Sequence, residues 1–376
     1  MSGPARAGRV LRAAVVGAGA VSRLHVRALE ASPHARLVAV TDQQRERAEA
    51  LVDGCTPDPD GSLPRVHDDL ATLLATEQVD VVHICTPPGP HREQTEAAVA
   101  AGAHVVCEKP PALSLDDLEA MTDAARRAGR ELAVVFQQRT GSAVEHVRGL
   151  LTSGRLGRPL VALCHTLWYR DADYFAEPWR GRWATEGGGT TLSHSVHQID
   201  LMVHLLGDWA SVRADLWRLD REVETEDVST ATVRFAGGTV ASLVASVLSP
   251  RQTSSLRIDT EHATVTLDHL YGHGHDHWRI TPAAHVTTEE AAGWALPAAE
   301  RPSSHDDLVA SVYASLAGGR PLPDVVTAPA RALEIVTAIY ASAELGSEVT
   351  PEQLRTDPHR AGLKSTVRDL RTVPAR

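Results

Sequence analysis

Runs of consecutive apolar residues alternate with helix-length segments through the first 137 or so positions of the chain. The apolar runs lie at 11–16, 36–41, 79–85, 104–107 and 132–136. A strand that is apolar throughout is typical of a parallel sheet covered by helices on both faces. The pattern therefore predicts a doubly wound parallel α/β domain over residues 1–137, with a turn-rich surface loop at 53–66.

After Gln137 the pattern changes to longer segments in which apolar and polar residues alternate. Such segments pair across turn residues at 228–235 with 239–247 and at 255–259 with 263–267, and further strands are expected at 160–168 and 212–219. Period-two alternation predicts antiparallel strands with one polar face. We therefore predict a second α/β domain, residues 138–376, built on an open and mainly antiparallel sheet.

Apolar residues at helical spacing predict helices in this second half. They cover 190–206, a segment capped by Ser303 or Ser304 that ends before Gly318, and 331–345, which ends at Gly346. The helix at 331–345 can pack within its own domain or back on the first domain, and the sequence leaves both arrangements open.

The first predicted strand runs straight into a Gly-Ala-Gly-Ala-Val-Ser turn at 17–22, and a helix follows. Gly17 permits a tight turn, and Gly19 lets the backbone approach a pyrophosphate at the helix N-terminus. Ser22 replaces the third glycine of the dinucleotide-binding fingerprint and is still small enough for close packing. The residues that we predict to line a nucleotide site here are Gly17, Gly19, Ala20 and Val21.

The second strand ends in Asp42, where a carboxylate can accept hydrogen bonds from the adenosine ribose hydroxyls and repel a 2′-phosphate. That position favours NAD over NADP. Arg45 and Arg47 follow, and an arginine near this point can reverse the choice, so NADP stays open. An alternative role for Asp42 is to cap the helix expected at 43–51, and the two roles are compatible.

The apolar strand before residue 108 ends abruptly in the sequence VVCEKPP, residues 105–111. Because proline cannot continue a central strand, Glu108 and Lys109 lie where the strand surfaces. In an open α/β sheet this edge borders the ligand crevice. Lysine pKa values shift readily on desolvation, so Lys109 is a candidate proton carrier. The alternative is an ordinary surface lysine.

An aromatic-rich window runs from Trp168 to Trp183. It also holds Tyr169, Tyr174, Phe175 and Trp179, interleaved with Arg170, Arg180 and Arg182. Aromatic rings can stack on the apolar faces of sugars while arginines bind hydroxyls or a carboxylate. The alternative is a loop whose rings pack as a small satellite core. Our candidate substrate residues in this window are Tyr169, Trp179, Arg180 and Trp183.

Three glycines at 187–189 precede the helix predicted at 190–206 and allow close backbone approach. Ser193 and His197 stand four residues apart, which would place them on one helical face, and we select both as candidate substrate residues. For either histidine of this segment, His194 or His197, the alternative is a hydrogen-bonded helix residue without a catalytic role.

A histidine-rich segment starts at Tyr271 and contains His273, His275 and His277. Alternating histidines can bind a transition metal, but glycines make the segment flexible and its spacing matches no structural zinc site. His194 and His197 do not form a better candidate metal site, because the sequence shows no third ligand for them. We therefore expect no metal.

Composition limits the partners and the compartment. The formal net charge of −11 argues against a nucleic-acid or anionic-membrane partner, and no apolar stretch is long enough to span a bilayer. The four cysteines form no CxxC pair, which fits a reducing compartment. The N-terminus is polar and lacks a signal-peptide core, so we expect a cytoplasmic protein.

In combination, these motifs resemble the glucose–fructose oxidoreductase / inositol dehydrogenase / MocA family over nearly the whole chain. The motifs are the glycine turn with His25 following, TPPGPH at 86–91, EKP at 108–110, and the three glycines that lead to His197 and Asp200. The resemblance implies an N-terminal Rossmann domain and a C-terminal α/β domain whose open antiparallel sheet forms homodimers or homotetramers. It also implies reversible hydride transfer between NAD(P) and a hydroxyl carbon of a sugar, cyclitol or related polyol.

The resemblance also assigns roles to particular residues. Lys109 matches the family's catalytic lysine and His197 its catalytic histidine. Lys109 would take the hydroxyl proton as the hydride leaves, and His197 would bond the same oxygen or take the proton instead. The nicotinamide is expected near the loop after the apolar run at 79–85 and near the EKP motif, with Thr86, Pro87, His91, Glu108 and Lys109 as cofactor-binding residues. Lys109 is also expected to contact the substrate.

Ser193 departs from the family pattern. Catalytic members usually carry an aspartate four residues before the histidine, and a serine can exchange hydrogen bonds but cannot hold charge. Two alternative functions therefore stay open. One is an NAD-dependent glycosidase or eliminating enzyme that recycles its cofactor, and the other is a nucleotide-binding regulator without catalytic activity.

Overall fold

The computed structural model describes residues 9–268 and 272–371. It divides into two compact units. The first comprises the chain up to Ala112, Leu118–Gln137 and Ser304–Ala328, and the second comprises Leu113–Asp117, Gln138–Ser303 and the chain from Pro329 onward. Most of the polar N-terminus, and Tyr271 of the histidine-rich segment, lie outside the described residues. Within them, no helix combines the length and the apolar character that crossing a bilayer requires.

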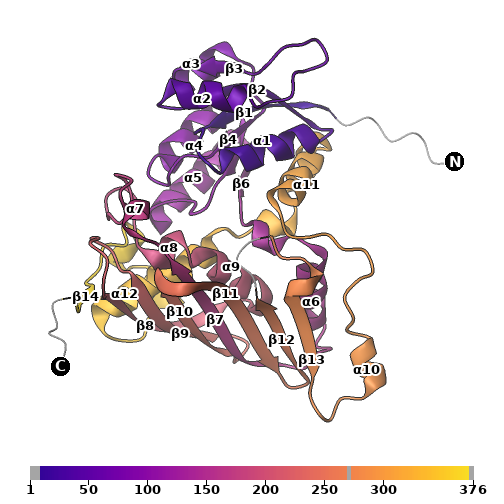
Figure 1. The fold of residues 1–376 in the computed structure, drawn as a ribbon, viewed down its shortest axis with the longest axis vertical. Helices are drawn as coiled ribbons and strands as arrows, with labels where there is room; N and C mark the ends of the chain where they lie inside the picture. Colours follow the sequence, from indigo (N-terminus) through magenta and orange to yellow (C-terminus); the bar gives the residue numbers. More distant parts are fainter. Residues whose placement is uncertain (1–8, 269–271, 372–376) are drawn as a thin grey trace. The chain divides into compact units, whose positions relative to one another are not determined.

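The first unit contains a six-stranded parallel sheet in the order β3-β2-β1-β4-β5-β6, which confirms the predicted doubly wound domain (Figure 1). Its strands are β1 Leu11–Val16, β2 Ala35–Thr41, β3 Arg65–His67, β4 Val81–Ile84, β5 His104–Cys107 and β6 Leu132–Val134. Its helices are α1 Ser22–Ala31, α2 Arg45–Val52, α3 Leu70–Thr76, α4 His91–Ala100 and most of α5 Leu115–Ala128. The strands carry fully buried side chains such as Ala13, Val82 and Val106, as expected for a sheet covered on both faces.

A helix from late in the sequence completes this first unit. Helix α11 (His305–Ala317) packs against α1, and its residues Leu308, Val309 and Tyr313 belong to the same buried cluster as β1. Ser304 caps the helix, because its hydroxyl accepts the Asp307 N–H at 3.1 Å. The predicted helix near the C-terminus, α12 (Ala330–Leu345), packs on two elements of the second unit, α9 (Val196–Leu206) and β8 (Trp209–Arg218).

The second unit is built on an eight-stranded sheet in the order β13-β12-β11-β7-β10-β9-β8-β14 (Figure 1). The strands are β7 Pro159–Tyr169, β8 Trp209–Arg218, β9 Val228–Phe235, β10 Val240–Ser246, β11 Leu248–Thr260, β12 Ala263–Asp268, β13 Trp278–Pro282 and β14 Arg368–Asp369. The expected hairpins β9–β10 and β11–β12 are antiparallel. The pairs β7–β10 and β8–β14 are parallel, so the sheet is mixed and mainly antiparallel.

One face of this sheet is covered and the other is open. Along β7 the buried residues Ala162, Cys164 and Trp168 alternate with residues that include Val161 and Tyr169, which are 47% and 42% exposed. Helices α9 and α12 pack on the sheet. The other α-helices of the second unit are α6 Ser142–Thr152, α7 Ala172–Phe175, α8 Thr190–Ser193, α10 Thr288–Ala292 and α13 Pro351–Leu354. The predicted alternation of buried and exposed residues is therefore present, but the exposed residues are polar along β9 (Thr232 and Arg234) and largely apolar along β7.

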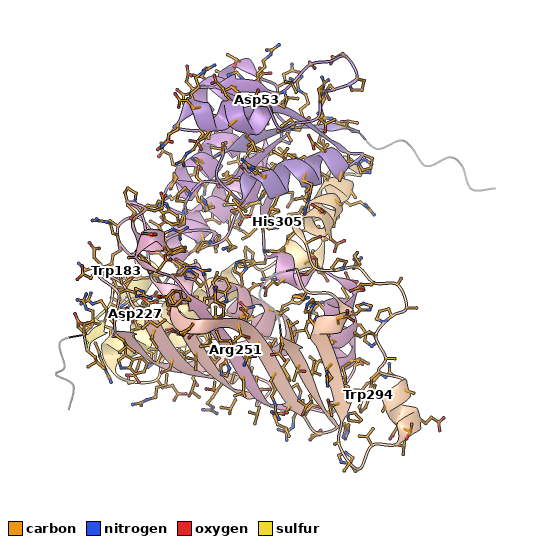
Figure 2. All side chains as sticks on the ribbon, in the orientation of Figure 1. Asp53, Trp183, Asp227, Arg251, Trp294 and His305 are labelled. Carbon is orange, nitrogen blue, oxygen red and sulfur yellow. The ribbon has the colours of Figure 1, made fainter. Side chains whose placement is uncertain are left out.

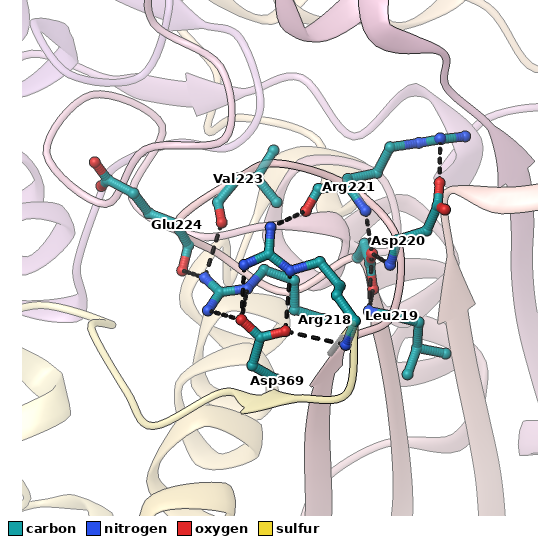
Figure 3. A network of polar contacts seen from close by, with 9 residues as sticks. Arg218, Leu219, Asp220, Arg221, Val223, Glu224 and Asp369 are labelled. Carbon is teal, nitrogen blue, oxygen red and sulfur yellow. Dashed lines mark hydrogen bonds and ion pairs between the residues drawn. The ribbon is translucent and has the colours of Figure 1, made fainter. Parts of the chain in front are cut away.

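The loop after β8, residues 219–227, is held by a charged cluster and is called here the supporting loop. Arg218 donates to the carbonyls of Val223 and Glu224 at 2.8 and 3.3 Å and to the Asp369 carboxylate at 2.7 Å (Figure 3). Hydrogen bonds from Arg371 and from Arg218 hold the pKa of Asp369 well below its usual range. The last described strand therefore fixes the start of the supporting loop.

Candidate functional site

The two glycines of the turn in the first unit differ in their surroundings: Gly17 is closely packed, whereas the space beside Gly19 is open. Gly17 has a φ of +91°, and a Cβ at this position would lie 2.8 Å from the Thr86 backbone nitrogen. Gly19 is exposed, and a Cβ there would meet nothing within 4 Å. Gly17 is therefore required by the fold, whereas the space beside Gly19 is open for the backbone approach that a pyrophosphate needs.

The N-terminus of α1, the helix that follows the turn, has free capacity to bind an anion. Val21 is the N-cap of α1, no side chain caps it, and the first turn contains no acidic residue. The Ser22 hydroxyl donates to the Gly19 carbonyl at 2.6 Å, so the residue in the third glycine position fixes the turn from inside. Uncapped N–H groups at a helix start bind phosphate readily, and these residues therefore fit a dinucleotide.

Asp42 is bound to the same turn. Its Oδ2 accepts the Ala18 N–H at 2.7 Å and its Oδ1 accepts the Gln44 N–H at 2.8 Å. Helix α2 begins only at Arg45, with Gln44 as its N-cap, so Asp42 does not cap that helix. Arg45 forms ion pairs with Glu49 at 2.9 Å and with Asp68 at 2.5 Å. The guanidinium nearest in sequence to Asp42 is therefore already held by two carboxylates.

The carboxyl ends of three neighbouring strands bring the other predicted cofactor residues to the same edge. Strand β4 lies between β1 and β5, and Glu108 N donates to the Ile84 carbonyl at 3.0 Å. Thr86 is half-buried and Pro87 is exposed directly after β4, and the half-buried Lys109 follows β5. The Lys109–Pro110 peptide is cis. Lys109 thus lies at the edge of the sheet where nucleotide ligands bind in this class of fold.

His91, which was predicted to bind the cofactor, is fully buried at the start of α4. Its Nε2 lies 2.8 Å from the Thr86 carbonyl oxygen, and its Nδ1 lies 3.2 Å from that of Pro111. Burial lowers the pKa of this histidine, so the ring stays neutral. His91 therefore shapes the cofactor edge through the two backbone segments that it joins, and the structure does not place its ring on the edge itself.

Glu108 was also predicted as a cofactor residue, but its carboxylate points into the unit and is 4% exposed. Its Oε1 lies 2.9 Å from His25 Nε2 and 3.0 Å from His305 Nε2, and its Oε2 accepts the Lys109 N–H at 3.1 Å. His305 is labelled in Figure 2. Glu108 therefore ties α1 and α11 to the residue that carries the candidate proton carrier.

This contact continues as a chain of hydrogen bonds. His25 Nδ1 lies 2.7 Å from His83 Nδ1, and His83 Nε2 lies 2.9 Å from the Tyr313 hydroxyl. We call His25, His83, Glu108, His305 and Tyr313 the buried histidine network. Neutral tautomers satisfy it if the tyrosine donates to His83, His83 donates to His25, and both other histidines donate to the carboxylate.

Electrostatics support this proton arrangement. Burial would raise the pKa of Glu108, but the hydrogen bonds from His25 and His305 outweigh it and hold that pKa well below its usual range. Burial and the neighbouring His25 keep the pKa of His83 well below its usual value. The network therefore contains an ionised carboxylate and a neutral His83.

The network also contains the described residues that come nearest to a metal-binding set, namely His25, Glu108 and His305. Their separations of 2.9 and 3.0 Å are those of direct hydrogen bonds, which the neutral tautomers already explain. The three histidines that the sequence singled out are not in such a set. His273 accepts from Trp278 at 3.2 Å, His275 Nε2 lies 2.7 Å from the Ser142 hydroxyl, and His277 accepts the Gly274 N–H at 2.9 Å.

In the second unit, the three glycines pack against protein rather than facing open space. A Cβ on Gly188 would lie 2.5 Å from the Tyr340 hydroxyl, and one on Gly189 would collide with the Glu226 carbonyl. The buried Glu226 carboxylate accepts the Thr191 N–H at 2.9 Å and the Tyr340 hydroxyl at 2.8 Å. The supporting loop and α12 thus fix the start of the segment that carries Ser193 and His197.

The single helix predicted over 190–206 is broken. Helix α8 ends at Ser193 and α9 begins at Val196, and the Ser195 N–H reaches back five residues to the Thr190 carbonyl at 2.9 Å. Ser193 and His197 therefore belong to two different helices, and the expectation that they lie on one face of a single continuous helix is wrong. His197 is buried, at 1% exposure, and Ser193 is half-buried.

Asp200, one turn beyond His197, has a partner of its own. Arg139 Nε donates to its Oδ2 at 2.7 Å, and a second guanidinium nitrogen bonds Oδ1. Both residues are nearly inaccessible, at 3% and 0% exposure. Burial raises the pKa of Asp200, and Arg139 opposes that rise. The motif aspartate therefore anchors α9 to the segment before α6.

In the aromatic window, Tyr174 and Trp179 gather around Arg180, whereas Trp183 and Tyr169 lie elsewhere in the second unit. The Arg180 guanidinium carbon lies 3.8 Å from the ring centroid of Tyr174 and 4.2 Å from that of Trp179. Trp183, labelled in Figure 2, contacts Tyr340 edge to face at 5.8 Å. Tyr169 instead alternates with the buried Trp168 and lies on the open face of the sheet, so it is not part of this group.

Sequence reasoning missed one residue that the structure places directly on a predicted site residue. The Ser193 hydroxyl lies 2.6 Å from Oε1 of Glu186, which is 2% exposed. Glu186 also accepts the Gly181 N–H at 2.5 Å. The available signal was an acid immediately before three glycines, in a segment where a serine replaces an expected acid.

Comparison with known proteins assigns both halves of the chain. Residues 11–136 match the oxidoreductase family with an NAD-binding Rossmann fold, and residues 144–266 match the GFO/IDH/MocA C-terminal domain. This chain belongs to the Gfo/Idh/MocA oxidoreductase family. The segment of this Gfo/Idh/MocA protein that matches the NAD-binding Rossmann model contains the glycine turn, Asp42 and Lys109.

Relatives within the Gfo/Idh/MocA family act on carbohydrates by their names. D-apiose dehydrogenase of Paraburkholderia graminis is 30% identical over 73% of this chain and 72% of that protein. D-glucoside 3-dehydrogenase of Escherichia coli is 32% identical over 52% of this chain, and the match spans 54% of that relative. The WlbA dehydrogenase structure from Bordetella pertussis, in complex with NADH and UDP-GlcNAcA, is 27% identical with a TM-score of 0.79, over 91% of this chain and 99% of that one.

Proposed function

We propose that this protein is an NAD-dependent dehydrogenase that oxidises a secondary hydroxyl of a sugar, cyclitol or related polyol, or reduces the corresponding ketone. The observation that carries the proposal is the position of Lys109 at the strand edge that also holds Gly17 and Thr86. Bound NAD supplies the hydride acceptor. The names of the sugar-acting relatives support the substrate class.

The scarcity of lysine relative to arginine in this chain supports a role for Lys109. The chain has 37 lysines and arginines, of which only Lys109 and Lys364 are lysines. An arginine would serve wherever a positive charge alone is needed, but a guanidinium does not release its proton in proteins. A lysine amine can take the proton of the substrate hydroxyl as the hydride departs. We assign this step to Lys109 and propose His197 as the second proton-handling residue.

We propose NAD as the preferred cofactor, with Asp42 as the selecting residue. A carboxylate after the second strand favours ribose hydroxyls and disfavours a 2′-phosphate. Arg45, the basic residue that could favour NADP, is paired with Glu49 and Asp68. The expected result is a kcat/KM that is higher with NAD than with NADP for the same substrate.

We also propose that the open face of the second unit's sheet forms a homodimer or homotetramer, and that the enzyme works in the cytoplasm. Exposed apolar residues on that face include Val161 and Val240, at 47% and 44% exposure. NAD is available in the cytoplasm, and all four cysteines are free thiols. A Val161→Glu substitution should lower the mass measured by light scattering if the face is an interface.

A substrate panel with two lysine variants tests the catalytic proposal. Polyols, inositols, amino sugars and a nucleotide-linked sugar acid are each offered with NAD and with NADP, and reduced cofactor is followed optically. Lys109→Met and Lys109→Arg should bind NAD normally and lose about 100-fold or more in kcat. Lys364→Met, the matched control at an exposed position, should keep full activity.

Two outcomes of this experiment would contradict the proposal. Full turnover by Lys109→Arg would show that a fixed positive charge is sufficient and would remove proton transfer from Lys109. Product formed without net reduced cofactor would indicate an eliminating or hydrolytic enzyme that recycles its NAD, instead of a dehydrogenase.

A further inference from the structure

Glu186 and Ser193 form a closely coupled pair in the second unit. The Ser193 Oγ lies 2.6 Å from Glu186 Oε1, and the Gly181 N–H donates to Glu186 Oε2 at 2.5 Å. The guanidinium of Arg180 lies 3.9 Å from the same carboxylate. Glu186 is 2% exposed, whereas Ser193 is only half-buried. The carboxylate is therefore enclosed, and its hydroxyl partner is the member of the pair that can reach a ligand.

The direction of this hydrogen bond determines what Ser193 can offer. An ionised carboxylate accepts hydrogen bonds only, so the serine hydroxyl must donate its proton to Glu186. The serine oxygen then keeps its lone pairs for a second partner, and the negative charge behind it makes that oxygen a better acceptor. A substrate hydroxyl is a natural donor to such an oxygen.

The pair also bears on the missing acid of the motif. Position 193, four residues before His197, is where an aspartate was expected, and serine alone cannot hold charge there. The structure places a carboxylate at hydrogen-bond distance from this position, supplied from seven residues earlier in the chain. A carboxylate is thus present one hydrogen bond away from position 193.

We propose that Glu186 is a positioning residue that acts through Ser193, which receives a hydrogen bond from a hydroxyl of the polyol substrate. This inference rests on the proposed dehydrogenase function. Ser193 would contact the substrate, and Glu186 would orient the serine hydroxyl and supply the negative charge. The pair would therefore affect both substrate affinity and turnover, while the cofactor residues of the first unit would be unaffected.

An exchange of the acid between the two positions tests this proposal. Glu186→Gln removes the charge with little change in shape, and Ser193→Asp alone places two carboxylates against each other, so that they must share a proton. The double variant Glu186→Gln/Ser193→Asp restores one carboxylate at the site. We expect each single variant to lose about 10-fold or more in kcat/KM, and the double variant to recover to within about threefold of the unmodified enzyme.

The pH profile separates this role from a purely structural one. Ser193→Asp should lose activity at high pH relative to the double variant, because the second carboxylate of its pair then ionises and repels the first. Urea unfolding and NAD affinity should change little in the double variant. Glu177→Gln, an exposed acid of the same segment, is the matched control and should behave as the unmodified enzyme.

The outcomes distinguish this inference from the function on which it rests. Turnover by the unmodified enzyme, together with a Glu186→Gln variant within about twofold of it, would overturn the inference and leave the dehydrogenase proposal standing. A double variant no better than Glu186→Gln would also overturn it, because a structural role predicts no rescue. A complete absence of turnover in the unmodified enzyme would overturn the dehydrogenase proposal itself.

Discussion

His25 Nε2 lies 2.9 Å from Glu108 Oε1, so the helix that follows the glycine turn is bonded to the residue that precedes Lys109. The first partner belongs to α1, and the second follows directly after β5. Because both groups are buried, the bond is not weakened by competing water. Buried hydrogen bonds through Glu108 thus connect the helix after the glycine turn to the candidate proton carrier.

Glu108→Gln should destabilise this framework. The amide loses the charge that strengthens the bonds from His25 and His305, and its NH2 group would face the Lys109 N–H, another donor. We expect a loss of about 2–3 kcal/mol in the free energy of unfolding by urea. Glu46→Gln, at an exposed position on α2, should change it by less than about 0.5 kcal/mol. Equal unfolding midpoints for both variants would contradict a structural role for the network.

The two glycines of the turn should respond differently to the same substitution. Gly19→Ala adds a methyl group to open space, so the unfolding free energy should change by less than about 1 kcal/mol. If the pyrophosphate approaches the backbone there, NAD affinity should fall about 10-fold or more. Gly17→Ala should instead destabilise the protein by about 1–3 kcal/mol, because its φ of +91° and the nearby Thr86 nitrogen disfavour a side chain. Calorimetric titration with NAD measures the first effect, and unchanged affinity in Gly19→Ala would place the pyrophosphate elsewhere.

Much of the fold could be predicted from the sequence because its strands are long, apolar or regularly alternating. Strand β3 and helix α3 were not predicted, because Arg65–His67 is short and polar and follows a turn-rich stretch. The break between α8 and α9 at His194 and Ser195 was also not predicted, because the helical spacing of apolar residues over 190–206 continues across it. The periodicity of apolar residues indicates which residues are buried. It does not reveal a single helical turn that is widened by one residue.

The candidate site was predictable only where a motif encodes its own geometry. The glycine turn and the strand end at Lys109 are local features, and the sequence located both. The partners of Glu108 and Ser193 are not local in the same way. His305 lies 197 positions after Glu108, and only the return of α11 to the first unit brings them together. No spacing rule could show that the Glu108 side chain turns inward.

The ion pair between Arg139 and Asp200 should be costly to break from one side only. Arg139→Met leaves a buried carboxylate without its guanidinium, and we expect a loss of about 3–5 kcal/mol in the free energy of unfolding. In Arg139→Met/Asp200→Leu both charges are gone, so most of that loss should be recovered. Arg158→Met, which breaks an exposed pair with Glu261, should cost less than about 1 kcal/mol. Urea unfolding of the unmodified protein and the three variants measures these losses, and a double variant no more stable than Arg139→Met would contradict the prediction.

His204 on α9 should make the protein less stable in mild acid. Burial, followed by the positive charges of Arg139, Arg148 and Arg331, lowers its pKa to about 3. In the unfolded chain, His204 becomes protonated as the pH falls below the ordinary histidine pKa of 6.5. In the folded protein it becomes protonated only near pH 3. Between these values the unfolded state binds more protons, so stability falls as the pH falls, by up to about 1.4 kcal/mol per pH unit from this group.

A non-titrating side chain at position 204 should remove this component of the slope. His204→Gln is expected to lose less stability than the unmodified protein between pH 6.5 and 5, by about 1.5 kcal/mol over that interval. His285→Gln, which removes an exposed histidine, should keep the original slope and controls for the general effect of acid. Urea unfolding at several pH values measures all three curves. Parallel curves for His204→Gln and the unmodified protein would mean that His204 is protonated in the folded state, and that the interior around α9 admits a positive charge.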